Sequence, residues 1–194
     1  VLRALHRRRR IRLAGVVARR ASVRRALTHA GIPVFSEVTP ALLRTVDAVD
    51  AVTPASTHYE IVKACLPYTH VFVEKPLALT SREAADLVRR ARRYRKQLLV
   101  GRIFRFNGAV QRLRAIVRRR RRDLYYIEGH FTGPADVDRA DCSVVSSDIH
   151  LLDVLDYVLG ESPQSLYCRA RNFRRGCRFE DDALLTLNYR QNLS

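Results

Sequence analysis

The chain has 194 residues, 47% of them hydrophobic, and its 36 lysines and arginines outnumber 19 acidic residues to give a formal net charge of +17. This hydrophobic content excludes an intrinsically disordered chain, and no stretch reaches the roughly 18 consecutive apolar residues that a membrane helix needs. We therefore expect a soluble, cytoplasmic protein of one large or two small domains.

The positive charge is carried almost entirely by arginine, with runs at 7–10 and 118–122. A field of this size attracts polyanions at low salt. However, the runs contain no interleaved aromatic residues for base stacking, and no zinc-finger, RRM or KH signature is present. We expect no specific nucleic-acid function and keep a basic nucleic-acid binder as the third hypothesis.

Four cysteines, at 65, 142, 168 and 177, form no C-x-x-C motif and have no histidine at zinc-ligand spacing. Neither a metal site nor a disulfide framework is predicted from them.

Strand and helix patterns alternate along the first half of the chain. Strands are predicted at 11–18, 33–35, 48–53, 69–73 and 97–101, and helices at 21–30, 40–45, 58–65 and 81–95. This alternation is typical of a parallel sheet with right-handed crossovers. The fold class is therefore α/β, beginning with an incomplete Rossmann-type domain over 1–101.

The pattern changes after Arg102. Helices are predicted at 107–117 and 148–159, an extended segment at 124–131, and strands at 165–173 and 183–189. Consecutive strands with few helices favour an α+β domain with a mostly antiparallel open sheet over 102–194.

The most informative segment is 71–77, Val-Phe-Val-Glu-Lys-Pro-Leu. A buried strand that stops at Pro76 presents Glu74 and Lys75 at its carboxyl end, where ligands bind in open α/β sheets. The alternative is a surface turn in which both charges are merely solvated.

Five ordered motifs resemble the glucose-fructose oxidoreductase, inositol dehydrogenase and MocA (Gfo/Idh/MocA) family. They are the segment 46–54 with Thr57-His58, the Glu-Lys-Pro strand end, Gly101–Asn107, Tyr125–Gly129, and Asp148–Asp153 followed by 180–187. The resemblance implies hydride transfer between a nicotinamide cofactor and a secondary alcohol of a sugar, cyclitol or nucleotide-sugar.

The resemblance also implies site residues. It places Lys75 beside the nicotinamide and makes His150 the proton acceptor. On chemical grounds Asp148 or Asp153 could hold the His150 imidazole in one tautomer, although Asp153 could equally be a solvated residue of the helix face. The residues it implies for cofactor binding are Arg19, Arg20, Thr53, Pro54, His58, Glu74, Lys75, Pro76 and Arg105.

Chemistry supports these residue types independently. Removing hydride from a carbinol requires a base for the hydroxyl proton, and histidine suits a near-neutral reaction. A lysine stabilises the alkoxide-like oxygen that develops. Apart from the resemblance, His150 could equally be a buried histidine satisfied by a backbone carbonyl.

The chain departs from the family pattern at its start. No G-x-G occurs in the sequence, so the phosphate-binding turn of the family is missing, and we interpret the chain as truncated at both ends. At the end of the second family strand, Arg19 and Arg20 replace the usual acidic residue. Arginine fits a 2′-phosphate, so NADP is favoured over NAD, unless both arginines are simply the solvated start of a helix.

The expected partners are a sugar-like small molecule and a second copy of the chain, joined through the carboxyl-terminal sheet. A non-catalytic family member that acts as an interaction or sensory protein is the alternative to the enzyme.

Overall fold

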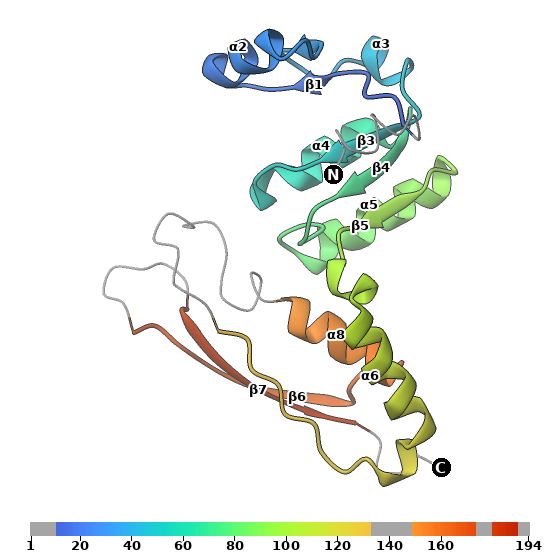
Figure 1. Cartoon of the computed structure of the whole chain (residues 1–194), viewed down its shortest axis with the longest axis vertical. Coiled ribbons are helices and arrows are strands. Elements are labelled where there is room, and N and C mark those ends of the chain that lie inside the picture. Colours follow the sequence, from blue (N-terminus) through green and yellow to red (C-terminus); the bar gives the residue numbers. More distant parts are fainter. Residues whose placement is uncertain (1–10, 133–148, 174–179, 190–194) are drawn as a thin grey trace.

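The computed structural model describes residues 11–132, 149–173 and 180–189. Figure 1 shows the parallel strands and their helices in one half of the molecule, and the longer carboxyl-terminal strands with α6 and α8 in the other. No helix among the described residues is long and apolar enough to cross a membrane. The expected α/β fold is confirmed, whereas a domain boundary at 101/102 stays a prediction.

Five short parallel strands follow the predicted order. They are β1 (Val16–Val17), β2 (Val34–Phe35), β3 (Ala48–Ala51), β4 (His70–Val73) and β5 (Leu98–Val100). β1 pairs only with β2, and β3, β4 and β5 form a separate sheet in that order. The prediction of a long first strand over 11–18 was wrong, because only two of its residues find a partner in β2.

Helices cover these strands. They are α2 (Ala21–His29), α3 (Pro40–Leu43), the 3₁₀ turn η1 (Ala55–Thr57), α4 (His58–Cys65) and α5 (Ser81–Arg93). Thr80 caps α5: its hydroxyl accepts from the Glu83 amide while the Glu83 carboxylate accepts from the Thr80 amide. Gly31, which follows α2, has a φ of +69°, a left-handed conformation that suits glycine.

The main core lies between the three-stranded sheet and helices α4 and α5. Its buried members are Leu43, Ala51, Val62, Cys65, Leu66, Val71, Val73, Leu87 and Ala91. Both helices contribute one apolar face to this core, so the positions of the strand ends and of α4 are fixed by the same packing.

The remaining elements are η2 (Ile103–Phe106), α6 (Gly108–Arg119), η3 (Arg121–Asp123), α8 (Ile149–Leu159), β6 (Ser165–Arg171) and β7 (Asp182–Asn188). β6 and β7 pair antiparallel, as expected. Residues 124–132 form no strand, so the alternation that predicted an extended segment at 124–131 did not produce a ladder. Alternating side chains alone do not supply a hydrogen-bonded partner.

Arginines of the run 118–122 have a structural use. Arg118 and Arg119 end α6, and the Arg121 guanidinium donates to the carbonyl of Leu159 at the end of α8 and pairs with Glu161 at 2.7 Å. A cation at a helix carboxyl end satisfies a carbonyl and interacts well with the helix dipole.

Candidate functional site

Three parallel strands end at one edge, and the sequence motifs follow them. The register aligns Ala51 of β3 with Val73 of β4 and Val100 of β5. The ladder continues one step further, since the Glu74 amide donates to Ala51 and the Gly101 amide donates to Val73. The residues that follow each strand, including Lys75, therefore share the carboxyl edge of the sheet, where ligands of open α/β sheets bind.

The Glu74 carboxylate is folded back over this edge. It accepts a hydrogen bond of 3.3 Å from the Lys75 amide. It also lies against Gly101, where an added Cβ would come within 3.0 Å of Oε2. Burial, and then the negative charge of Glu74, raises the pKa of Asp50 on the neighbouring strand.

The loop after β3 presents Thr53 and Pro54 to solvent. Thr57 fixes this loop through its hydroxyl, which contacts the Thr53 hydroxyl at 2.9 Å and donates to the Pro54 carbonyl at 2.8 Å. An exposed, internally braced loop at a strand end is a suitable ligand contact.

His58 lies under this edge instead of on its surface. Its side chain belongs to a residue only 1% exposed, and its ring nitrogens lie 2.7 Å from the Pro76 carbonyl and 2.8 Å from the Thr53 carbonyl. Its contacts are therefore to the protein backbone, and direct cofactor contact by His58 stays a prediction.

His150 is the second residue of α8 and sits among aromatic rings. Its ring centroid is 5.0 Å from that of Phe104 and 6.4 Å from that of Phe131. The imidazole of α8 therefore lies near η2, through Phe104, and near the segment after η3, through Phe131. Asp148, its predicted partner, lies outside the described residues.

Two arginines tie α8 to the end of β5. Arg105 donates through Nη2 to Asp153 at 2.7 Å and to Asp156 at 2.8 Å, and Arg102 donates to Asp153 at 2.7 Å. The Asp153 carboxylate pairs with these guanidiniums and raises the pKa of Arg105. Asp153 was a candidate orienting group for His150 or a solvated residue of the helix face, whereas the structure uses its carboxylate for these ion pairs.

Arg105 was predicted to bind cofactor, and that role stays a prediction. Its guanidinium is 28% exposed, pairs with α8 and lies 5.2 Å from the centre of the Tyr157 ring. Among its described contacts, Arg105 thus acts as a link between η2 and α8.

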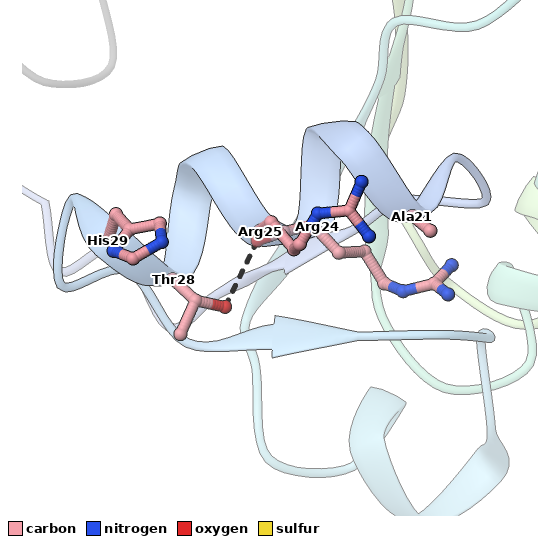
Figure 2. Close-up of a pocket in the computed structure, with 5 residues that line it drawn as sticks. All are labelled: Ala21, Arg24, Arg25, Thr28 and His29. Atoms are coloured by element: carbon pink, nitrogen blue, oxygen red, sulfur yellow. Dashed lines mark hydrogen bonds between the residues drawn. The ribbon is translucent and has the colours of Figure 1, made fainter.

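Arg19 and Arg20 lie exposed between β1 and α2. The Arg24 guanidinium donates to the carbonyls of Ala18 and Arg19, which fixes the backbone of this turn. Arg24 also lines a surface hollow on α2, with Ala21, Arg25, Thr28 and His29 (Figure 2). All five lining residues come from α2, and none of the predicted site residues is among them.

No group of three or more histidine, cysteine or acidic residues that could hold a metal ion occurs in the described parts of the chain. Cys65 is buried in the core, and burial raises the pKa of its thiol to about 11.

Comparison with known proteins agrees with this geometry. Residues 1–102 match the sequence model of the Gfo/Idh/MocA oxidoreductase family, described as having an NAD-binding Rossmann fold. The chain belongs to this family.

Two curated relatives and one solved structure illustrate its members. A UDP-N-acetylglucosamine 3-dehydrogenase of Acidithiobacillus ferrooxidans is 34% identical over 125 residues, which are 63% of this chain and 39% of that protein. A 2,7-anhydro-N-acetylneuraminate hydratase of Escherichia coli is 26% identical over 161 residues, 75% of this chain and 43% of that protein. The chain thus spans less than half the length of these curated relatives.

The solved structure is the WlbA dehydrogenase of Bordetella pertussis in complex with NADH and UDP-GlcNAcA. It has a TM-score of 0.75 at 22% identity, over 91% of this chain and 60% of that one, and it shows the shared fold of the family.

Sequence reasoning did not find the parts played by Gly101 and Arg102. The register puts Gly101 beside Glu74 at the shared strand edge, and Arg102 pairs with Asp153 of α8. A glycine at the end of a predicted parallel strand is the signal that could have found the first of them.

Proposed function

We propose that this chain supplies the nicotinamide side of a dehydrogenase site, in a protein that transfers a hydride between NAD(H) and a secondary alcohol of a nucleotide-sugar. The observation that carries the proposal is the Glu74-Lys75 pair at the shared carboxyl edge of β3, β4 and β5. The 34% identical relative named as a UDP-N-acetylglucosamine 3-dehydrogenase supports the substrate class.

The residues at this edge fit one half of a dinucleotide. Thr53 and Pro54 are exposed beside Lys75, and the Glu74 carboxylate rests where the Gly101 backbone leaves room for it. Carboxylate and hydroxyl groups suit ribose hydroxyls. The pyrophosphate-binding glycine turn is not among these 194 residues, since no G-x-G occurs in them.

A nicotinamide held at this edge would supply the hydride acceptor or donor of the proposed reaction. The Lys75 ammonium would donate a hydrogen bond to the substrate oxygen and stabilise the negative charge that develops there. The His150 imidazole, on the helix attached to the β5 end through Asp153, would take the hydroxyl proton. The rings of Phe104 and Phe131 would limit the directions available to that imidazole.

For the cofactor, the family description supports NAD. Arg19 and Arg20 favour an additional affinity for the 2′-phosphate of NADP, because both side chains are exposed while Arg24 holds the backbone between them and β1. Competition between NADH and NADPH for binding tests this. The double variant Arg19→Ala with Arg20→Ala should lower the affinity for NADPH at least about tenfold and leave the affinity for NADH unchanged. An equal loss of affinity for both cofactors would contradict the proposal.

We also propose that the β6–β7 sheet pairs with a second copy of the chain. Every residue of β6 is exposed, and Tyr167, Arg169 and Leu184 share its outward face according to the register. Light scattering should report a dimer that Tyr167→Glu with Leu184→Glu converts to a monomer. A monomeric wild-type chain would exclude this proposal.

The central proposal is tested on the chain itself by saturation-transfer NMR with millimolar NADH, which detects weak binding. We expect transfer to the nicotinamide protons, because the Glu74-Lys75 pair lies at the edge that carries the proposal. NAD⁺-dependent oxidation of UDP-N-acetylglucosamine, followed by NADH absorbance, should fall by about 10² in Lys75→Ala. The exposed surface variant Lys63→Ala is the control. Absence of saturation transfer to NADH would refute the proposal.

A further inference from the structure

One buried imidazole contacts both loops that carry the exposed residues of the strand edge. His58 Nδ1 lies 2.7 Å from the carbonyl of Pro76, next to Lys75, and Nε2 lies 2.8 Å from the carbonyl of Thr53. The two carbonyls are separated by 23 positions in the chain, yet they meet on opposite sides of the same ring.

The ring is held in place by α4, whose first residue is His58. Further along that helix, Val62 and Cys65 are completely buried in the core, as is Leu66 directly after it. The helix therefore cannot shift without disturbing the main core, and His58 is a rigid attachment point for the two loops.

Both partners of the ring are backbone carbonyls, which only accept hydrogen bonds, and an imidazole donates through a ring N–H. The buried ring therefore joins the two loops by short polar contacts on its two sides. Its removal would leave polar groups without this partner in a buried place, where an unsatisfied polar group is costly.

We propose that His58 is a positioning residue whose ring, as a bracket between the Thr53 and Pro76 carbonyls, fixes Lys75 relative to the Thr53-Pro54 loop. The Thr57 hydroxyl also contacts Thr53 and Pro54, so two side chains, His58 and Thr57, hold this loop. The role of this bracket in aligning the nicotinamide-side residues rests on the proposed function. The contacts of His58 with the two carbonyls do not.

The first test needs no variant. In the chain labelled with ¹³C and ¹⁵N, a ring nitrogen of His58 should show a directly bonded, slowly exchanging proton, with a coupling across the hydrogen bond to the carbonyl carbon of Thr53 or Pro76. A ring without such a proton would overturn the proposal, because the imidazole would then not be held by either carbonyl.

The second test compares two histidines whose side-chain contacts lie near opposite ends of β4. His70 accepts a hydrogen bond of 2.9 Å from the Gln97 amide at the start of the strand, whereas His58 acts at its end. His58→Phe should accelerate amide exchange of Glu74 by about tenfold or more, as expected for the loss of buried hydrogen bonds. His70→Phe should accelerate Gln97 instead and leave Glu74 unchanged.

His58→Asn provides a second variant, because its amide nitrogen carries two N–H groups but cannot reach two carbonyls that lie on opposite sides of the imidazole ring. Glu74 should exchange faster in it while the core amide of Val71 keeps its protection. Unchanged Glu74 exchange in a folded His58 variant overturns the proposal. Should neither variant fold, the ring-proton measurement on the wild-type chain decides.

Saturation transfer to NADH separates this inference from the proposed function. If the bracket aligns the site, transfer to the nicotinamide should fall at least about fivefold in His58→Asn and stay at the wild-type level in His70→Phe. No transfer in the wild-type chain would refute the proposed function, and the exchange pattern would still decide the role of His58.

Discussion

Replacing Asp153 with alanine removes the acceptor that holds α8 to the end of β5. Its carboxylate is only 9% exposed and accepts from Nε and Nη2 of Arg105, at 3.0 and 2.7 Å, and from Arg102 at 2.7 Å. Charge-assisted hydrogen bonds contribute roughly 1.5–3 kcal/mol, and loss of one partner from a buried pair costs about 3–5 kcal/mol.

Two features lower this estimate. Arg105 retains Asp156 as a partner at 2.8 Å, and the Arg102 side chain is 50% exposed, so water can replace the carboxylate there. We therefore expect Asp153→Ala to destabilise the chain by about 2–3 kcal/mol. For a chain of this length that corresponds to a fall in Tm of roughly 5–10 °C.

The assay is urea unfolding followed by far-UV circular dichroism, since the chain has no tryptophan. A double-mutant cycle of Arg105→Ala and Asp153→Ala should give a coupling of at least about 1 kcal/mol. The matched control is the exposed pair Glu60 and Lys63, 3.4 Å apart, with an expected coupling under about 0.5 kcal/mol. Equal couplings for the two pairs would refute the inference that α8 is held by this link.

Three smaller effects complete the predictions. Gly101→Ala should displace the Glu74 carboxylate, which lies 3.0 Å from the added Cβ, and the amide spectrum should shift there, but not when Glu74→Ala is also present. Because the folded state raises the pKa of Asp50, the folded chain binds that proton more tightly and loses stability as pH rises above the usual 3.8. Asp50→Asn should therefore raise Tm at neutral pH but not below pH 3.8. A difference in Tm between variant and wild type that stays constant with pH would contradict this. Thr80→Ala should cost about 1 kcal/mol by removing the cap of α5, measured by urea unfolding against the exposed neighbour Ser81→Ala, and equal losses would contradict the cap.

Much of the strand edge could be predicted because its determinants are local. A β-branched run that stops at Pro76 fixes where β4 ends. Parallel strands of similar length end together, so Thr53 and Gly101 follow the same edge once β3 and β5 are recognised. The helix at 58–65 was predicted at its observed bounds, since its apolar positions recur at helical spacing.

The partners of long side chains could not be predicted from local pattern. Asp153 pairs with Arg105, 48 positions away, and the choice depends on how α8 packs against η2. Likewise, the resemblance implied that His58 binds the cofactor, and it did not predict that the ring is buried between two carbonyls. Both cases depend on tertiary distances that a single sequence does not contain.

The two links have a common consequence for the arrangement of the site. His58 attaches the segment after β4 to the core through α4, by its contact with the Pro76 carbonyl, and Asp153 attaches the helix of His150 to the β5 end. β4 and β5 are adjacent in the sheet, so the positions of Lys75 and His150 both depend on the same pair of strands. A substitution in either link should therefore change how Lys75 and His150 lie relative to each other while leaving both residues chemically intact.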